Sequence, residues 1–362
     1  MPGNTFGNYL SITTFGESHG KGVGVIIDGL PPGLEISEED IQKDMDRRKP
    51  GQSDFSTPRK EADKVSILSG VFQGKTTGTP MAVVLYNTNT RSQDYGEIAD
   101  KFRPGHADYT YLKKYGIRDW RGSGRASGRE TAARVAAGAV ARKWLKEKGV
   151  DILAYVKAAA GIECAVFDSS AVEKNPFRAC DMNAAEKMAE RMKELIKEGN
   201  SAGGIVECRI KGVPPGLGEP VFDRLEANLG KAVLSIGAVK GFEIGSGFSA
   251  AGMTGSENND WMDSSGFLSN NAGGVLGGIS SGEEIIFRAA VKPTSSITKE
   301  QKTINTEGKE TVIITEGRHD PIICPRIVPV IEAMSALVIM DNWLSFRAMR
   351  GFDPGQERGG VN

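Results

Sequence analysis

The sequence has few cysteines, no leader-like start and no long uninterrupted apolar run. The four cysteines among 362 residues show no C-x-x-C spacing, which excludes a zinc ribbon and a dithiol redox motif and is typical of a reduced, cytoplasmic protein. The first residues lack the basic and apolar segments of a signal peptide, so we expect none. The most apolar stretch, 333–340, is interrupted by Ser335 and flanked by Glu332 and Asp341, so we expect no membrane span.

Neither sign of charge is in excess. Lysine and arginine number 45, and aspartate and glutamate number 46, so a nucleic-acid partner is not expected. Apolar residues make up 39% and charged residues 25%, as in a soluble globular protein. Glycine is unusual, because it fills 46 of 362 positions, about 13% against a typical ~7%. This excess indicates many loops with positive φ or close backbone approach, as in a ligand-binding enzyme.

Apolar periodicity and capping residues predict a mixed α/β (α+β) chain. Helices are expected from Ser37 to Pro50-Gly51, from the Ser127–Glu130 capping box to Gly149, at 183–198 and at 325–350. The last is largely apolar, so we expect it to be central and buried. Strands rich in valine and isoleucine are expected at 23–29, 81–87, 152–158, 205–211, 284–291 and 311–316.

One short motif occurs twice at half-chain spacing. Gly29-Leu-Pro-Pro-Gly-Leu34 recurs as Gly212-Val-Pro-Pro-Gly-Leu217, an offset of 183 residues. The repeat indicates either duplication of one strand–turn–helix unit or two coincidental tight turns, which proline and glycine often make. Duplication would make residues 1–362 one domain with pseudo-twofold halves.

The three histidines share one kind of setting. His19, His106 and His319 each have a glycine and an acidic residue within two positions. Histidine moves protons near neutral pH, so the trio predicts acid–base groups on loops. The alternative for each is a solvated or structurally bonded loop histidine. A three-histidine metal site is disfavoured, because no two have a helix-compatible spacing.

Arginines gather around the glycine-rich entry to the helix predicted at Ser127. The basic positions are Arg47, Arg48, Lys49, Arg103, Arg118, Arg121, Arg125, Arg129 and Arg134. Cations at a helix N-terminus are unfavourable unless an anion compensates, which favours ligand binding by Arg125 and Arg129 over a merely solvated basic face. Lys292–Ser296, with one cation and three hydroxyls, could cradle a phosphate or form a polar turn. These residues predict a pocket for a small, multiply anionic ligand.

Seven segments, in order along nearly the whole chain, resemble the chorismate synthase family. They are 16–20 (GESHG), 47–53 (RRKPGQS), 103–108 (RPGHAD), 122–131 (GSGRASGRET), 235–241 (SIGAVKG), 292–296 (KPTSS), and 317–321 (GRHDP) leading into 332–334 (EAM). The resemblance implies a β-α-β sandwich with helices between two antiparallel sheets, in a cytoplasmic homotetramer. It implies a lyase of aromatic amino-acid biosynthesis. The reaction is an anti-1,4-elimination that turns 5-enolpyruvylshikimate 3-phosphate into chorismate and phosphate with reduced FMN and no net redox change.

The resemblance also assigns residue roles. His19 would protonate the departing phosphate, His106 would protonate the flavin, and Asp320 would act at the C6 proton, with no metal. The implied flavin contacts are Arg125, Ala126, Ser127, Gly237, Ala238, Gly277, Lys292, Pro293, Thr294, Ser295, Ser296 and Arg318. The implied substrate contacts are Ser18, Arg48, Arg103 and Arg134.

Three further questions stay open at this point. Some family members reduce their own flavin with a nicotinamide cofactor such as NADPH, and the sequence does not decide this. The chain could instead be a histidine phosphatase or phosphotransferase that uses Arg318 and His319 without flavin. It could also be a non-enzymatic binder of anionic metabolites.

Overall fold

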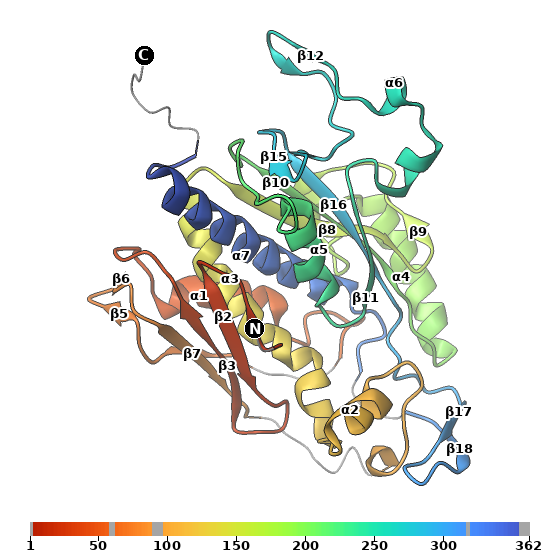
Figure 1. The fold of residues 1–362 in the computed structure, drawn as a ribbon. Coiled ribbons are helices and arrows are strands. Elements are labelled where there is room, and N and C mark those ends of the chain that lie inside the picture. The colour runs from red at the N-terminus through yellow and green to blue at the C-terminus, as the bar shows by residue number, and fades with distance from the viewer. Residues whose placement is uncertain (1–2, 58–61, 89–96, 316–318, 355–362) are drawn as a thin grey trace.

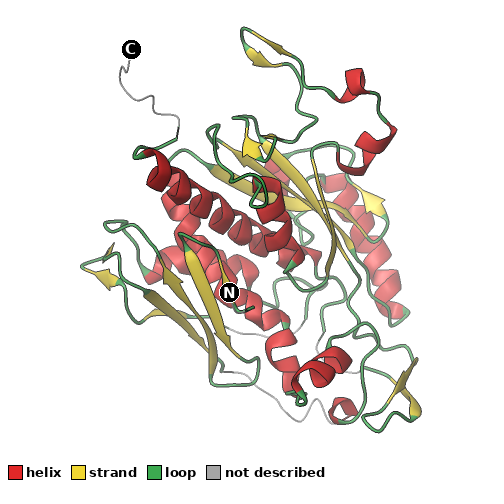
Figure 2. Cartoon of the chain, viewed as in Figure 1, coloured by secondary structure: helices red, strands yellow, loops and turns green. Residues whose placement is uncertain are grey.

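A computed structural model describes residues 3–57, 62–88, 97–315 and 319–354. Two five-stranded antiparallel sheets enclose a layer of helices (Figures 1 and 2). The first sheet has the order β1 (Thr5–Phe6), β2 (Ser11–Gly16), β3 (Gly22–Asp28), β7 (Met81–Tyr86) and β4 (Val65–Ile67). The second has the order β11 (Val239–Ile244), β16 (Ile285–Val291), β10 (Gly204–Lys211), β8 (Asp151–Ala159) and β9 (Ile162–Glu163). This arrangement confirms the expected sandwich.

Four helices fill the space between the sheets. They are α1 (Glu38–Arg48), α3 (Thr131–Glu147), α5 (Leu225–Leu234) and α7 (Cys324–Arg350). Outside this layer are α2 (Asp108–Tyr115), α4 (Met182–Lys197) and α6 (Gly255–Asn258). The remaining strands pair as small hairpins: β5 (Val71–Phe72) with β6 (Lys75–Thr76), β12 (Met262–Asp263) with β13 (Gly266–Phe267), β14 (Val275–Leu276) with β15 (Ile279–Ser280), and β17 (Gln301–Ile304) with β18 (Glu310–Ile313).

The expected helices and strands are confirmed, with two local differences. The strand expected at 311–316 is β18, which pairs only with β17 and belongs to neither large sheet. The Ser127 hydroxyl accepts from the Arg129 N–H at 3.3 Å and opens a 3₁₀ turn, Gly128–Glu130, that runs into α3. The Glu130 carboxylate does not complete a capping box, because it accepts instead from Thr14 and Arg134.

Helix α7 is the centre of the core. By length and composition it could cross a membrane, but 89% of its most apolar 18-residue stretch is buried inside the protein, as in a core helix. It packs against α3 so closely that a Cβ on Gly138 would lie 2.3 Å from the Ala333 Cβ. Glycine at position 138 therefore permits the close approach of the two central helices. The four cysteines are buried and unpaired.

The repeated Pro-Pro turns make the same hydrogen bonds. In the first turn the Thr76 hydroxyl donates to the Pro31 carbonyl at 2.7 Å and accepts from the Leu34 N–H at 3.0 Å. In the second turn, the Ser280 hydroxyl donates to the Pro214 carbonyl at 2.7 Å and accepts from the Leu217 N–H at 2.9 Å. Pro214 and Leu217 each lie 183 positions after their counterparts in the first turn. Internal duplication stays a prediction, and this correspondence supports it.

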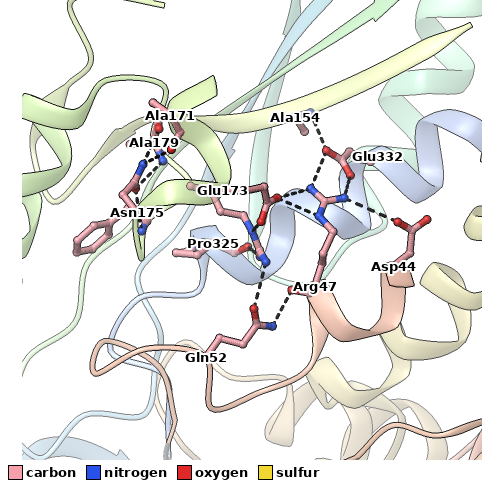
Figure 3. A network of polar contacts seen from close by, with 12 residues as sticks. Asp44, Arg47, Gln52, Ala154, Ala171, Glu173, Asn175, Ala179, Pro325 and Glu332 are labelled. Atoms are coloured by element: carbon pink, nitrogen blue, oxygen red, sulfur yellow. Dashed lines mark hydrogen bonds and ion pairs between the residues drawn. The ribbon is translucent and has the colours of Figure 1, made fainter. Parts of the chain in front are cut away.

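A buried carboxylate joins the helix layer to the second sheet (Figure 3). Glu332 of α7 is 1% exposed, pairs with Arg47 of α1 and with Arg142 of α3 at 3.2 Å, and accepts from the Ala154 N–H of β8 at 3.0 Å. Burial alone would raise the pKa of Glu332, but the two guanidinium groups outweigh it and hold the pKa below its ordinary value. The group is therefore a carboxylate in the folded protein.

We expect Glu332→Ala to lower the free energy of unfolding by about 3–5 kcal/mol at neutral pH, because two guanidinium groups lose their buried partner. The measurement is urea-induced unfolding. The matched control is Glu186→Ala on the exposed face of α4, which should change little.

The free energy of unfolding of the wild-type protein and of Glu332→Ala should depend on pH to different extents. Because the folded-state pKa of Glu332 is lowered, its contribution is present above the unfolded pKa and is lost as pH falls through the folded pKa. The wild-type protein should therefore lose more stability on acidification than Glu332→Ala. Equal stability of the two proteins at neutral pH would contradict this interpretation.

Candidate active site

A cavity of about 970 Å³ opens where α3 and α7 begin. Its walls come from loops far apart in the sequence, and α2 lies at the same end of the molecule (Figure 1). Its described lining includes two carboxylates, Glu130 and Asp320, against nine cationic side chains. These cations are Arg48, Arg103, Arg125, Arg129, Arg134, Lys231, Lys240, Lys292 and Arg326. The cavity therefore suits a ligand with several negative charges.

The glycine-rich segment before α3 forms one wall through unusual backbone geometry. Gly122, Ser123 and Gly124 have φ values of 59°, 71° and 50°, which side-chain-bearing residues rarely adopt. A Cβ on Gly122 would lie 2.1 Å from His19 Nδ1. Glycine at 122 therefore lets this segment pack directly on the His19 imidazole.

His106 lies in a bonded cluster beside that segment. Its Nδ1 is 3.1 Å from Asp108 Oδ1 and 3.1 Å from the Arg103 guanidinium. At this one Nδ1 atom Asp108 can only accept a hydrogen bond and Arg103 can only donate one, so the two contacts favour opposite tautomers of the neutral ring. Neither contact involves Nε2. Burial lowers the pKa of His106, and Arg103 and Lys292 add to this effect against the opposing pull of Asp108. His106 is thus neutral over a wider pH range than an exposed histidine.

A second cluster places two arginines on one buried carboxylate. Asp63 accepts from Arg48 at 3.0 Å and also from Arg129. Burial would raise the pKa of Asp63, but these two guanidinium groups outweigh it and lower the pKa. Burial lowers the pKa of Arg48 to about 10, and the neighbouring cations Arg326 and Arg129 contribute. The single negative charge of Asp63 is therefore shared by two positively charged side chains, Arg48 and Arg129.

Asp320 is held by two donors on opposite segments. The Thr57 N–H donates to Oδ1 at 2.9 Å, and Arg326 of α7 pairs with Oδ2. Asp320 is 9% exposed and lines the cavity. Its carboxylate is therefore fixed in place, close to whatever the cavity binds.

Four buried polar groups of the lining have no hydrogen-bond partner among the described residues. They are Ser18 Oγ, Arg129 Nη2, Thr294 Oγ1 and Arg326 Nε. Leaving a buried donor unpaired costs about 1–3 kcal/mol, and more for a charged group, so such groups indicate where a ligand binds. All four can donate to phosphate or carboxylate oxygens, which fits both a phosphorylated flavin and an anionic substrate.

Most of the predicted site residues meet at this cavity. The lining contains Ser18, Arg48, Arg103, His106, Arg125, Ala126, Ser127, Arg134, Gly237, Ala238, Lys292, Pro293, Thr294, Ser295, Ser296 and Asp320. His19 is not among the lining residues but lies directly behind Gly122. Gly277 lies in the turn between β14 and β15 and does not line the cavity. Arg318 lies outside the described residues.

Several residues of the site were not predicted. Asp63 and Asp108 act as counterions to the arginines, and Arg326 binds Asp320. Asp108 has a recognisable signal, because it stands two positions after His106. Neither Asp63 nor Arg326 has such a signal in the sequence, because only the folded chain brings each of them close to its partner. Among the described residues, no three metal-ligating side chains cluster together.

Comparisons with known proteins agree on one family. A family model described as chorismate synthase matches residues 10–344. A protein named chorismate synthase from Synechocystis sp. is 56% identical over 356 residues, which cover 96% of this chain and 98% of that protein. One of the same name from Syntrophobacter fumaroxidans is 56% identical over 341 residues, covering 94% and 97%.

A solved structure agrees with the sequence relatives. A crystal structure described as chorismate synthase is 33% identical and covers 94% of this chain and 93% of that chain, with a TM-score of 0.75. The chain therefore belongs to the chorismate synthase family.

Proposed function

We propose that this protein converts 5-enolpyruvylshikimate 3-phosphate to chorismate and phosphate by anti-1,4-elimination, with reduced FMN and no net redox change. The observation that carries the proposal is the cavity itself, whose described lining holds nine cationic side chains and two carboxylates. Four buried donors of that lining, two of them on these cations, have no partner among the described residues. The proposed substrate has two carboxylates and one phosphate, and it matches that excess of positive charge. The names of the relatives point to the same reaction.

Reduced FMN, when bound, would supply electron density to the substrate. We propose that it is held by the segments 125–127, 237–238 and 292–296, which share the cavity wall. Thr294 offers there a hydroxyl that has no partner among the described residues, and Lys292 offers a cation whose pKa is lowered by burial and by Lys240. Gly277 and Arg318 remain proposed flavin contacts from the family resemblance.

The substrate would be bound by the arginine side of the cavity. Ser18 presents a hydroxyl without a partner in the described part of the chain. Asp63 holds Arg48 in place, and Asp108 holds Arg103. Arg134 joins them from α3, where its Nε donates to Glu130 at 2.8 Å. Such fixed donors stabilise an anion without reorganising when it binds.

Proton transfers are proposed for three side chains. His19, behind Gly122, gives a proton to the departing phosphate. Asp320, oriented by Thr57 and Arg326, acts as the carboxylate at the C6 proton. His106 exchanges a proton at Nε2 next to the flavin in the tautomer whose Nδ1–H donates to Asp108.

We further propose a cytoplasmic homotetramer. The segments around α6 and β12 project from the body (Figure 1). Phe248, shortly before α6, is 82% exposed, and Trp261, next to β12, is 65% exposed. Phe222, in the loop before α5, is 92% exposed. Exposed apolar groups of this kind support contact with another subunit.

The proposed reaction predicts an absolute requirement for reduced flavin. Under anaerobic conditions the protein should form chorismate from the enolpyruvyl substrate with reduced FMN, followed by absorbance, and none without FMN. His19→Ala and His106→Ala should each lower kcat by about 100-fold or more, because each removes a proton-transfer group. Lys187→Ala on the exposed face of α4 is the control. Anaerobic turnover that persists without flavin would overturn the proposal.

The cluster around His106 predicts a titration shift. In the ligand-free protein the lowered pKa means that His106 becomes charged only below the ordinary range near 6.5, and an anion bound beside it should raise the pKa. The measurement is an NMR pH titration of 15N-histidine with and without oxidised FMN. Only three histidines are present, so the His106→Gln spectrum assigns the signal. An ordinary or raised pKa in the ligand-free protein would be the contrary result.

A further inference from the structure

Arg326 lies in the first turn of α7, lines the cavity and has two nitrogen atoms in different surroundings. Its Nη1 pairs with Asp320 Oδ2, while its Nε is buried and has no partner among the described residues. The side chain is 19% exposed and belongs to the cavity lining. No family motif used above contains this residue.

A guanidinium group can serve two acceptors at once because its five N–H donors point in fixed directions in one plane. The bond from Nη1 to Asp320 therefore fixes the direction of Nε. A lysine at this position would keep the charge but could not hold both directions. Arg326 is thus suited to bind one carboxylate of the protein and one anionic oxygen of a ligand together.

The segments that hold Asp320 are tied together behind the cavity. Arg178 donates to the Pro325 carbonyl at 2.6 Å, next to Arg326, and to the Gln52 side chain at 3.1 Å. Gln52 belongs to the loop that leads to Thr57, and it donates back to the carbonyl of Arg47 at 2.7 Å. Figure 3 shows Pro325 and Gln52 at this network. The Arg326 end of α7 and the Thr57 loop are therefore placed by one rigid support.

The local charge also favours an additional anion. Arg48, Arg129 and Arg326 lie close enough that the last two depress the pKa of the buried Arg48. Their carboxylate partners are Asp63 and Asp320. Among the described residues, these two carboxylates leave one of the three positive charges without a carboxylate partner, and a bound anion would supply the balance.

We propose that Arg326 contacts the substrate and positions the base at the same time, with Nε donating to a phosphate or carboxylate oxygen of the substrate while Nη1 holds Asp320. Substrate binding and placement of the Asp320 carboxylate are then coupled through one side chain. This inference rests on the proposed function and adds a residue that the family resemblance does not assign.

The test uses the flavin-loaded protein with the enolpyruvyl substrate under anaerobic conditions. Arg326→Gln and Arg326→Lys should each raise KM by about 10- to 100-fold, the effect expected for a lost charged hydrogen bond. Both should also lower kcat, because Asp320 loses its partner. The control is Arg347→Gln in the same helix, where Arg347 is 43% exposed and pairs with Asp353 at 3.1 Å away from the cavity. Thermal unfolding of each variant shows that it is folded.

A double-mutant cycle of Arg326 and Asp320 distinguishes an effect of Arg326 on the position of Asp320 from a general loss of active-site structure. In an Asp320→Asn background, Arg326→Gln should still raise KM but cause little further loss of kcat. Two results would overturn this inference and leave the proposed function standing. One is that both Arg326 variants keep the wild-type kcat and KM. The other is that the fold-losses of kcat caused by Asp320→Asn and Arg326→Gln multiply in the double variant. If Arg326→Gln does not fold, Arg326→Lys carries the same test. An inactive wild-type protein would instead refute the proposed function, and this inference with it.

Discussion

The structure depends on the concentration of positive charge at the point where α3 and α7 begin. Bringing guanidinium groups together out of water is costly unless each finds a partner. Asp63 and Asp108 supply part of that compensation from inside the protein, and each holds arginines in a fixed orientation. The positive charge that these two carboxylates do not neutralise is available to bind an anionic ligand. The internal carboxylates thus set both the stability and the selectivity of the cavity.

The fold supplies the rigidity that this arrangement needs. The two sheets press the helix layer from both sides, and α3 and α7 approach closely at Gly138. Behind the cavity, Glu332 ties α1, α3, α7 and β8 together with a second set of buried charges. The cavity residues come from loops and from helices, with Arg48 on α1, Arg134 on α3 and Arg326 on α7. Of the anchoring carboxylates, Asp108 belongs to α2 and Asp63 to a loop. Positioning of this kind is what electrostatic stabilisation of a charged transition state requires.

Local signals predicted the elements well, because capping residues and apolar periodicity act within one segment. The Ser37 cap and the strands around Val25 are of this type. Signals that depend on tertiary partners failed. Glu130 has capping-box spacing, yet Thr14 and Arg134 take its carboxylate. Asp63 and Arg326 could not be assigned, because their partners are distant in sequence and only the assembled loops bring them together.

The most direct test is the affinity of the substrate when Arg129 is removed, because its Nη2 has no partner among the described residues while its Nη1 pairs with Asp63. Isothermal titration of 5-enolpyruvylshikimate 3-phosphate in the presence of oxidised FMN would compare the wild-type protein with Arg129→Gln. The matched control is Arg191→Gln on the surface of α4, where Arg191 pairs with Glu194. The account predicts an affinity about 10- to 100-fold weaker for Arg129→Gln and no change for the control. An unchanged dissociation constant for Arg129→Gln would contradict it.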